Sequence, residues 1–98
     1  ETMAIKKVFN GRAGKLVCSA PKATYGNLLG ATGAVDLITT LLAMRYQTVP
    51  PTINLNEPDP QCDLDYCANQ SRELDIQNAL IINRGRGGIN CVLAVQRP

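Results

Sequence analysis

Residues 22–46, "KATYGNLLGATGAVDLITTLLAMRY", give the strongest indication of the architecture, because a glycine-rich entry runs directly into a strongly apolar helical pattern. Residues 31–46 are predicted to form a helix on which apolar side chains cover most of the circumference. Its polar stripe is narrow and consists of Thr32, Asp36, Thr39 and Thr40. A helix that is apolar on nearly every side needs packing partners all round, and the few strands of this chain offer one sheet face at most. The sequence therefore predicts part of a larger body.

Three glycines stand at the start of that helix, with Gly26, Gly30 and Gly33 spaced by four and then three residues. If the helix begins near Asn27, the glycines fall close to one face, where another backbone or a ligand can approach. A helix N-terminus also suits an oxyanion or a phosphate. On spacing alone, glycines for close helix packing beside a solvated Lys22 are the simpler interpretation.

The flanking segments have simpler patterns. Residues 1–9 read as the end of a helix stopped by Asn10-Gly11, and residues 15–20 as a short strand ending at Pro21. Lys22 is therefore expected on a strand-to-helix connection. An extended connection is predicted for 48–62, a short strand for 63–68, polar exposed chain for 70–74, and a hairpin from strands 78–83 and 90–96 around a glycine-rich tip.

Length and charge bound the class of protein. Ninety-eight residues, 1–98, amount to one domain or to a piece of a larger one, with a small core. The formal net charge of +2 is too weak to indicate a nucleic-acid partner. The apolar runs are far shorter than the ~20 residues that cross a bilayer, so no membrane association is predicted. No secretory signal is visible, which favours a cytoplasmic protein, and Glu1 is expected to be a processing point.

The four cysteines leave three possibilities open. Three of them, Cys18, Cys67 and Cys91, lie in β-branched or apolar runs, which favours buried thiols over disulfide bridges. A four-cysteine zinc site is the sharper alternative. The gap between Cys62 and Cys67 is slightly long for it, and Cys18 and Cys91 each lack a close second ligand, so no metal is predicted.

Three motifs together resemble the C-terminal part of β-ketoacyl-[acyl carrier protein] synthases. They are Lys-x-x-x-Gly before Gly-Ala-x-Gly-Ala in residues 22–34, "PPTINLNEPDPQCDLDY" in 50–66, and the glycine frame of "RGRGGIN" in 84–90. The likeness covers essentially the whole chain. It implies an α/β thiolase-like fold, an α-β-α-β-α sandwich in a subunit several times as long, of which this chain is the C-terminal portion with the buried helix and a terminal hairpin.

The resemblance also exposes a missing catalytic group. Active members of the family use a cysteine nucleophile from their first half and two histidines from their second half, which assist decarboxylation of a malonyl thioester. The position of the second histidine is Asn27 here, and the chain contains no histidine. Asparagine can donate a hydrogen bond but cannot cycle a proton near neutral pH. Lys22 matches the family's lysine, and a structural ion pair or hydrogen bond is its simpler role. No catalytic residue is predicted, and Lys22 and Asn27 are degenerate positions.

The hairpin departs from the family as well. Active members carry Gly-Phe-Gly-Gly preceded by phenylalanine, and these aromatic residues gate the acyl pocket. Arg84 and Arg86 take the gate-equivalent positions here, which puts hydrated cations in place of apolar rings. The two arginines could pair with carboxylates elsewhere in the assembly, whereas an RNA-binding tract would need a disordered, repetitive setting. Asn90 is expected to stabilise the turn.

With these two departures, the chain resembles the chain length factor, or ketosynthase beta, of type II polyketide synthases. The resemblance implies a heterodimer with a catalytic ketosynthase, an acyl carrier protein that brings phosphopantetheine, and no cofactor bound by this chain. The N-terminal part of the subunit is expected as a separate chain bound to this one. Two alternatives remain: an active condensing enzyme that uses Asn27 and Lys22, and a small module held by zinc or disulfides.

Overall fold

The long helix of the computed structural model is α3 (Thr32–Tyr46), which confirms the helix predicted for residues 31–46. The structure describes all 98 residues. Helix α3 ends at Tyr46, and the left-handed backbone of the following Gln47 (φ 51°) stops the helical turn. Only Thr32 and Met44 of this helix are buried, and Ile38 remains 57% exposed. The rest of this chain therefore leaves most of the apolar circumference of α3 uncovered. Such a helix is expected to pack against further structure.

The predicted hairpin is also confirmed. Strands β3 (Asn78–Arg84) and β4 (Asn90–Gln96) pair antiparallel in a register that places Ile81 opposite Leu93 and Arg84 opposite Asn90. Gly87 and Gly88 have φ values of 81° and 83°, which a residue with a side chain adopts only at a cost, so the tip requires its glycines. One face of the hairpin, centred on buried Ile81, packs against α3.

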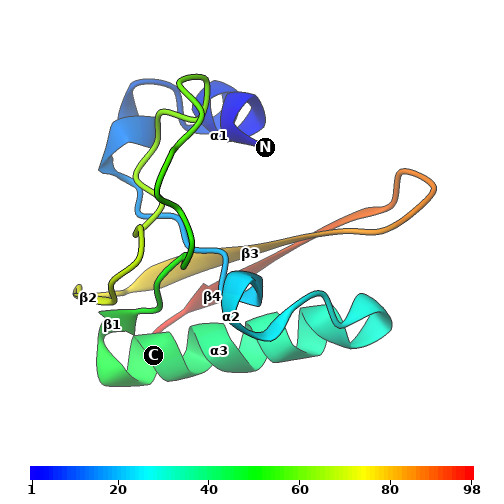
Figure 1. Cartoon of the computed structure of the whole chain (residues 1–98). Helices are drawn as coiled ribbons and strands as arrows, with labels where there is room; N and C mark the ends of the chain where they lie inside the picture. Colours follow the sequence, from blue (N-terminus) through cyan, green and yellow to red (C-terminus); the bar gives the residue numbers. More distant parts are fainter.

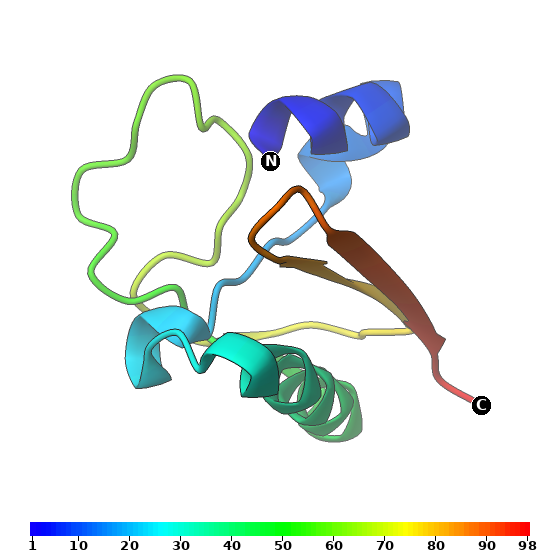
Figure 2. The ribbon, with the colours of Figure 1, turned by 90° about the vertical axis from the view of Figure 1, so that its right-hand side faces the viewer.

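The N-terminal elements lie on the other side of the hairpin from α3 (Figures 1 and 2). Helix α1 (Thr2–Phe9) was predicted, and the 3-10 helix η1 (Asn10–Lys15) that follows it was not. The long connection runs beside α1 and is held there by the Lys6–Asp63 ion pair, with Nζ 2.5 Å from the carboxylate, and by a hydrogen bond between the hydroxyls of Thr2 and Tyr66.

The prediction of short strands at residues 15–20 and 63–68 was wrong. Each segment forms only isolated parallel bridges, Val17 with Asp65 and Thr52 with Ala68. Regular pairing instead joins β1 (Thr48–Val49) to β2 (Arg72–Glu73), inside segments expected to be an extended connection and exposed polar chain. A β-prone run becomes a strand only where a neighbour supplies a continuous ladder, and here the neighbouring segments touch for one residue at a time.

The glycine-rich entry is not the first turn of α3. The four-residue helix α2 (Lys22–Tyr25) ends at Gly26, which has a φ of 83°, and the 3-10 turn η2 (Leu29–Ala31) precedes α3. The helix begins at Thr32 rather than near Asn27, so the expected single face of three glycines does not form. Lys22 was expected between a strand and a helix; it opens α2, which lies between residues 15–20, where no regular strand forms, and α3.

The four cysteines differ in burial, and none is bridged. Cys67 is buried, and its thiol donates to the carbonyl of Gln70 (3.3 Å). Cys18 is half-buried, and this burial raises the pKa of its thiol, with a further contribution from Asp65. Cys62 and Cys91 are exposed, so the expected burial of Cys91 is not found in this chain. No group of three potential metal ligands occurs, and none of the helices is both long and apolar enough to span a membrane.

Candidate functional site

Asn27 holds a tight turn in front of α3. Its side-chain oxygen accepts hydrogen bonds from the backbone N–H of Leu29 (2.9 Å) and from the hydroxyl of Thr32 (3.1 Å). The hydroxyl oxygen of Thr32 in turn accepts from the N–H of Leu28 (3.1 Å). Within the side chain of Asn27, the amide nitrogen is left without a partner in this chain. The residue can therefore offer a hydrogen-bond donor to a ligand, but no group that takes up and releases a proton.

Lys22 lies on the exposed side of α2, where no carboxylate meets it. The two ion pairs of the structure, Lys6–Asp63 and Arg72–Asp65, do not include it. The expected structural partner of Lys22 is thus absent from this chain. What fixes its helix is Tyr25, whose hydroxyl donates to Asp36 of α3 (2.8 Å).

Tyr25 and Asp36 were not singled out by the sequence. Burial raises the pKa of the Tyr25 phenol, and the hydrogen bond to Asp36 and its negative charge raise it further. The phenol is thus held in its protonated, donating form. The sequence signal for this contact was a tyrosine, Tyr25, that precedes a helix with a carboxylate, Asp36, in its polar stripe.

The hairpin tip presents its two arginines on a well-defined turn. The N–H of Gly85 donates to the carbonyl of Ile89 (2.8 Å), and the amide of Asn90 donates to the carbonyl of Gly88 (3.0 Å). The second bond confirms that Asn90 stabilises the turn. Arg84 and Arg86 are exposed and make no ion pair. The tip therefore carries two guanidinium groups without counter-ions in this chain.

A cavity of about 340 Å³ separates the start of α3 from the hairpin. Leu29, Gly30 and Gly33 line one side, and residues of β3, β4 and the tip, among them Asn83 and Arg84, line the other. The turn held by Asn27 and the gate-equivalent Arg84 are thus brought to one cavity. Lys22, Asn27 and Arg86 do not line it.

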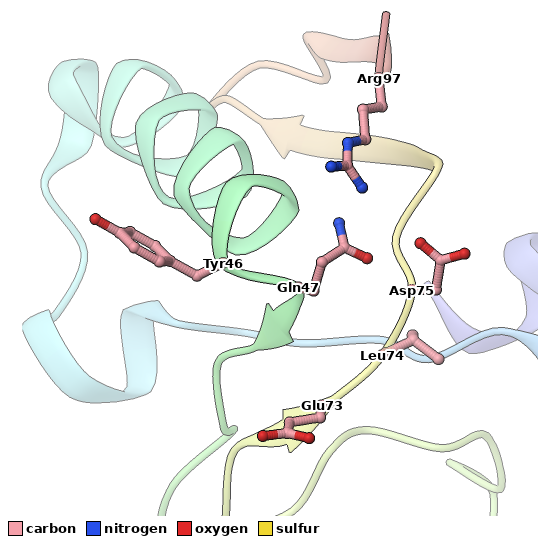
Figure 3. A pocket seen from close by; sticks show the side chains of 6 residues that line it. All are labelled: Tyr46, Gln47, Glu73, Leu74, Asp75 and Arg97. Atoms are coloured by element: carbon pink, nitrogen blue, oxygen red, sulfur yellow. The ribbon is translucent and has the colours of Figure 1, made fainter.

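A second hollow, of about 500 Å³, lies at the opposite end of α3 (Figure 3). In this view the side chains of Gln47, Asp75 and Arg97 point toward one another, while Tyr46 points away from them. The side-chain oxygen of Gln47 accepts from the N–H of Ile76 (2.7 Å), and its amide donates to the carbonyl of Met44 (2.5 Å). This end of α3 is a structural joint, and it contains none of the residues that the sequence singled out.

Comparison with known proteins identifies relatives along the whole chain. The family model described as "Beta-ketoacyl synthase, C-terminal domain" matches residues 1–56. A 3-oxoacyl-[acyl-carrier-protein] synthase 2 of Coxiella burnetii is 44% identical over 97 residues, which are 99% of this chain and 23% of the relative. The ketoacyl synthase alpha subunit of the tetracenomycin polyketide synthase of Streptomyces glaucescens is 39% identical over 98 residues, again 23% of its length.

A solved structure superposes with a TM-score of 0.94 at 36% identity, covering 97% of this chain and 23% of the other. It is described as a type II polyketide synthase acyl-carrier protein in complex with its ketosynthase bound to the hexaketide. This likeness confirms the expected fold, the C-terminal part of a thiolase-like α/β sandwich, and it confirms the family resemblance drawn from the three motifs. The chain spans about a quarter of the length of the relatives it matches.

Proposed function

This chain belongs to the β-ketoacyl synthase family, as a C-terminal domain of that family, and we propose that it is part of a chain length factor of a type II polyketide synthase. In this role the subunit does not condense acyl units. It pairs with a catalytic ketosynthase and shapes the tunnel that holds the growing poly-β-ketoacyl chain.

Asn27 carries this proposal. The family places an imidazole at this position for decarboxylation, and a well-placed general acid or base contributes about 10²- to 10⁴-fold to a rate. Asparagine supplies no such group, and its oxygen is engaged by Leu29 and Thr32. A side chain that stabilises the local turn and has no titrating group is consistent with a non-catalytic subunit.

The hairpin gives independent support. An apolar gate must open and close over an acyl chain without carrying water into the pocket. Arg84 and Arg86 are exposed, hydrated cations on a turn that their glycine neighbours shape, and they cannot form such a gate. Loss of the gate and loss of the imidazole in one chain are consistent with one lost activity.

The partners follow from the same role. A chain length factor needs a ketosynthase to supply the nucleophile, and an acyl carrier protein to deliver extender units on phosphopantetheine. The solved neighbour is described as a ketosynthase in complex with an acyl-carrier protein, which supports the carrier protein as a partner.

An active condensing enzyme is the second candidate. It is favoured by the names of the relatives, which include 3-oxoacyl-[acyl-carrier-protein] synthases and a ketoacyl synthase alpha subunit. In that case Asn27 would donate its free amide hydrogen to the thioester oxygen, and Lys22 would supply positive charge.

Carbon dioxide release separates the two candidates. The full-length protein that contains this chain is purified alone and mixed with malonyl-loaded carrier protein. We expect no release above the protein-free control, and release when a catalytic ketosynthase is added. Decarboxylation by the subunit alone, lost in Asn27→Ala, would establish the active enzyme instead.

A further inference from the structure

Asn10 joins α1 to η1 in a backbone conformation that residues with a side chain rarely adopt. Its φ and ψ angles are 48° and −129°, and its N–H donates to the carbonyl of Lys6, which closes the last turn of α1. This pair of angles lies outside the left-handed helical region that asparagine tolerates, in a region that glycine alone occupies readily. The fold therefore holds Asn10 in a strained conformation.

The ψ angle of Asn10 brings the next main-chain nitrogen close to its own side chain. At a ψ of −129°, the Cβ atom of Asn10 and the nitrogen of Gly11 are nearly eclipsed across the Cα–C bond, because the substituents of a tetrahedral Cα stand about 120° apart. The same eclipsing occurs in a five-membered ring closed by a bond between the nitrogen of Gly11 and the Cγ of Asn10. The backbone thus already has the geometry that closure of this ring requires.

Both residues are accessible in this chain. Asn10 and Gly11 are exposed, and a Cβ atom added at Gly11 would meet nothing within 4 Å. Neither of the side-chain hydrogen bonds made by α1 involves the carboxamide of Asn10. Because Gly11 has no side chain, its nitrogen can approach the carboxamide without steric hindrance.

We infer that Asn10 is a site of spontaneous deamidation. The nitrogen of Gly11 loses its proton to solvent base and attacks the Cγ of Asn10, and ammonia leaves with a proton taken from water. The product is a succinimide ring. Water then opens the ring at one of its two carbonyls and yields aspartate, or isoaspartate with the main chain rerouted through the side-chain carboxyl. The reaction needs no co-reactant except water, and the inference does not depend on the proposed function.

The products change the charge and the backbone at the end of α1. A carboxylate replaces an amide, so the formal net charge of +2 falls by one unit. Isoaspartate also adds a methylene group to the main chain between α1 and η1. The new negative charge stands at the C-terminus of a helix, where the helix dipole disfavours it. Deamidation should therefore loosen the joint between these two elements.

The site can be followed in one short tryptic peptide, residues 8–12, because a lysine precedes it and an arginine ends it. The full-length protein that contains this chain is incubated near neutral pH in water enriched in oxygen-18, and Asn10 and Asn56 are analysed by tandem mass spectrometry. Asn56 is also exposed but precedes Glu57, whose side chain hinders the attack, so it is the internal control. We expect aspartate and isoaspartate, each with one solvent oxygen, to accumulate at Asn10 well before Asn56 reacts.

The folded backbone should accelerate the reaction. In guanidinium chloride the unfolded chain samples the reactive conformation of Asn10 only rarely, whereas the fold supplies it in advance. We expect the native protein to react about tenfold faster than the unfolded chain under otherwise equal conditions.

Two glycine variants of η1 identify the attacking nitrogen. Gly11→Ala adds a side chain next to that nitrogen and should slow the reaction severalfold, in the native and in the unfolded protein. Gly14→Ala is the matched control, since Gly14 is also exposed and an added Cβ there also meets nothing within 4 Å. Its rate should equal that of the wild type. Because the unfolded chain is measured as well, a folding defect in Gly11→Ala does not obscure the result.

Three results would overturn the inference. One is a native protein in which Asn10 stays intact or reacts more slowly than in the unfolded chain, which would mean that the fold protects the residue. Another is aspartate without isoaspartate, because direct hydrolysis of the amide gives aspartate alone. The third is an equal rate in Gly11→Ala and wild type.

Discussion

At the residue scale, Asn27 combines a chemical loss with a structural gain. The sequence was sufficient to predict the loss, because the absence of a titrating side chain can be read from one letter. The gain could not be read in this way, since it depends on Leu29 adopting a φ of 53° and on Thr32 folding back toward the turn. An asparagine five residues before a helix-starting threonine is a weak signal on its own.

Asn27→Ala removes the acceptor for both Leu29 and Thr32, and we expect it to destabilise the turn by about 1 kcal/mol. Hydrogen exchange of the full-length protein should show faster exchange confined to peptides covering residues 27–36. Asn27→Asp keeps an acceptor oxygen and adds negative charge close to the start of α3, so it should exchange like the wild type. Equal exchange in Asn27→Ala and wild type would mean that the turn is held by other contacts.

At the element scale, the sequence predicted the elements whose signals are local. Helix α3 and the β3–β4 hairpin follow from periodicity and from glycines within a short stretch. The pairing of β1 with β2 joins Thr48 to Glu73 across the whole connection, and no local pattern of two residues indicates such a partner. The bridge between Val17 and Asp65 was invisible for the same reason.

Asp65 is the residue that holds these distant segments together. Its backbone carbonyl accepts from the N–H of Cys18 (2.7 Å), and its carboxylate binds Arg72 (2.6 Å) and the N–H of Cys67 (3.1 Å). The hydrogen bond from Cys67, followed by Arg72, lowers the pKa of Asp65. Because the pKa is lower in the folded state, the stabilisation is present above the ordinary carboxyl pKa of about 3.9 and is lost as the pH falls through the folded value.

We therefore expect the connection to loosen below about pH 4, with a small free-energy change because the carboxylate is solvent-exposed. Urea midpoints of the full-length protein between pH 3 and pH 6 test this. Asp65→Asn should reduce the acid-dependent fall in midpoint, whereas Glu57→Gln, at an exposed carboxylate that makes no ion pair, should not. An identical pH profile for Asp65→Asn and wild type would contradict a role for this carboxylate.

At the scale of the whole molecule, the core is too small for the apolar surface that surrounds it. Only seven residues are buried, and none of the large side chains is fully enclosed. Leu41 and Leu42 of α3 remain 48% and 46% exposed, and Val92 of β4 is 59% exposed. Exposed apolar side chains on both α3 and β4 are typical of an interface with further protein. The predicted burial of α3 on all sides thus needs structure beyond these residues.

Leu41→Lys tests this directly. On a solvent-exposed surface such a substitution changes stability by about 0.5 kcal/mol or less, but beneath a packed layer it buries an unpaired charge and costs several kcal/mol. We expect the full-length protein to lose at least several degrees in Tm, while Ser71→Lys, a lysine introduced on the exposed connection, leaves Tm nearly unchanged. If both variants melt like the wild type, α3 keeps this face in water, and the apolar circumference of the helix would need another explanation.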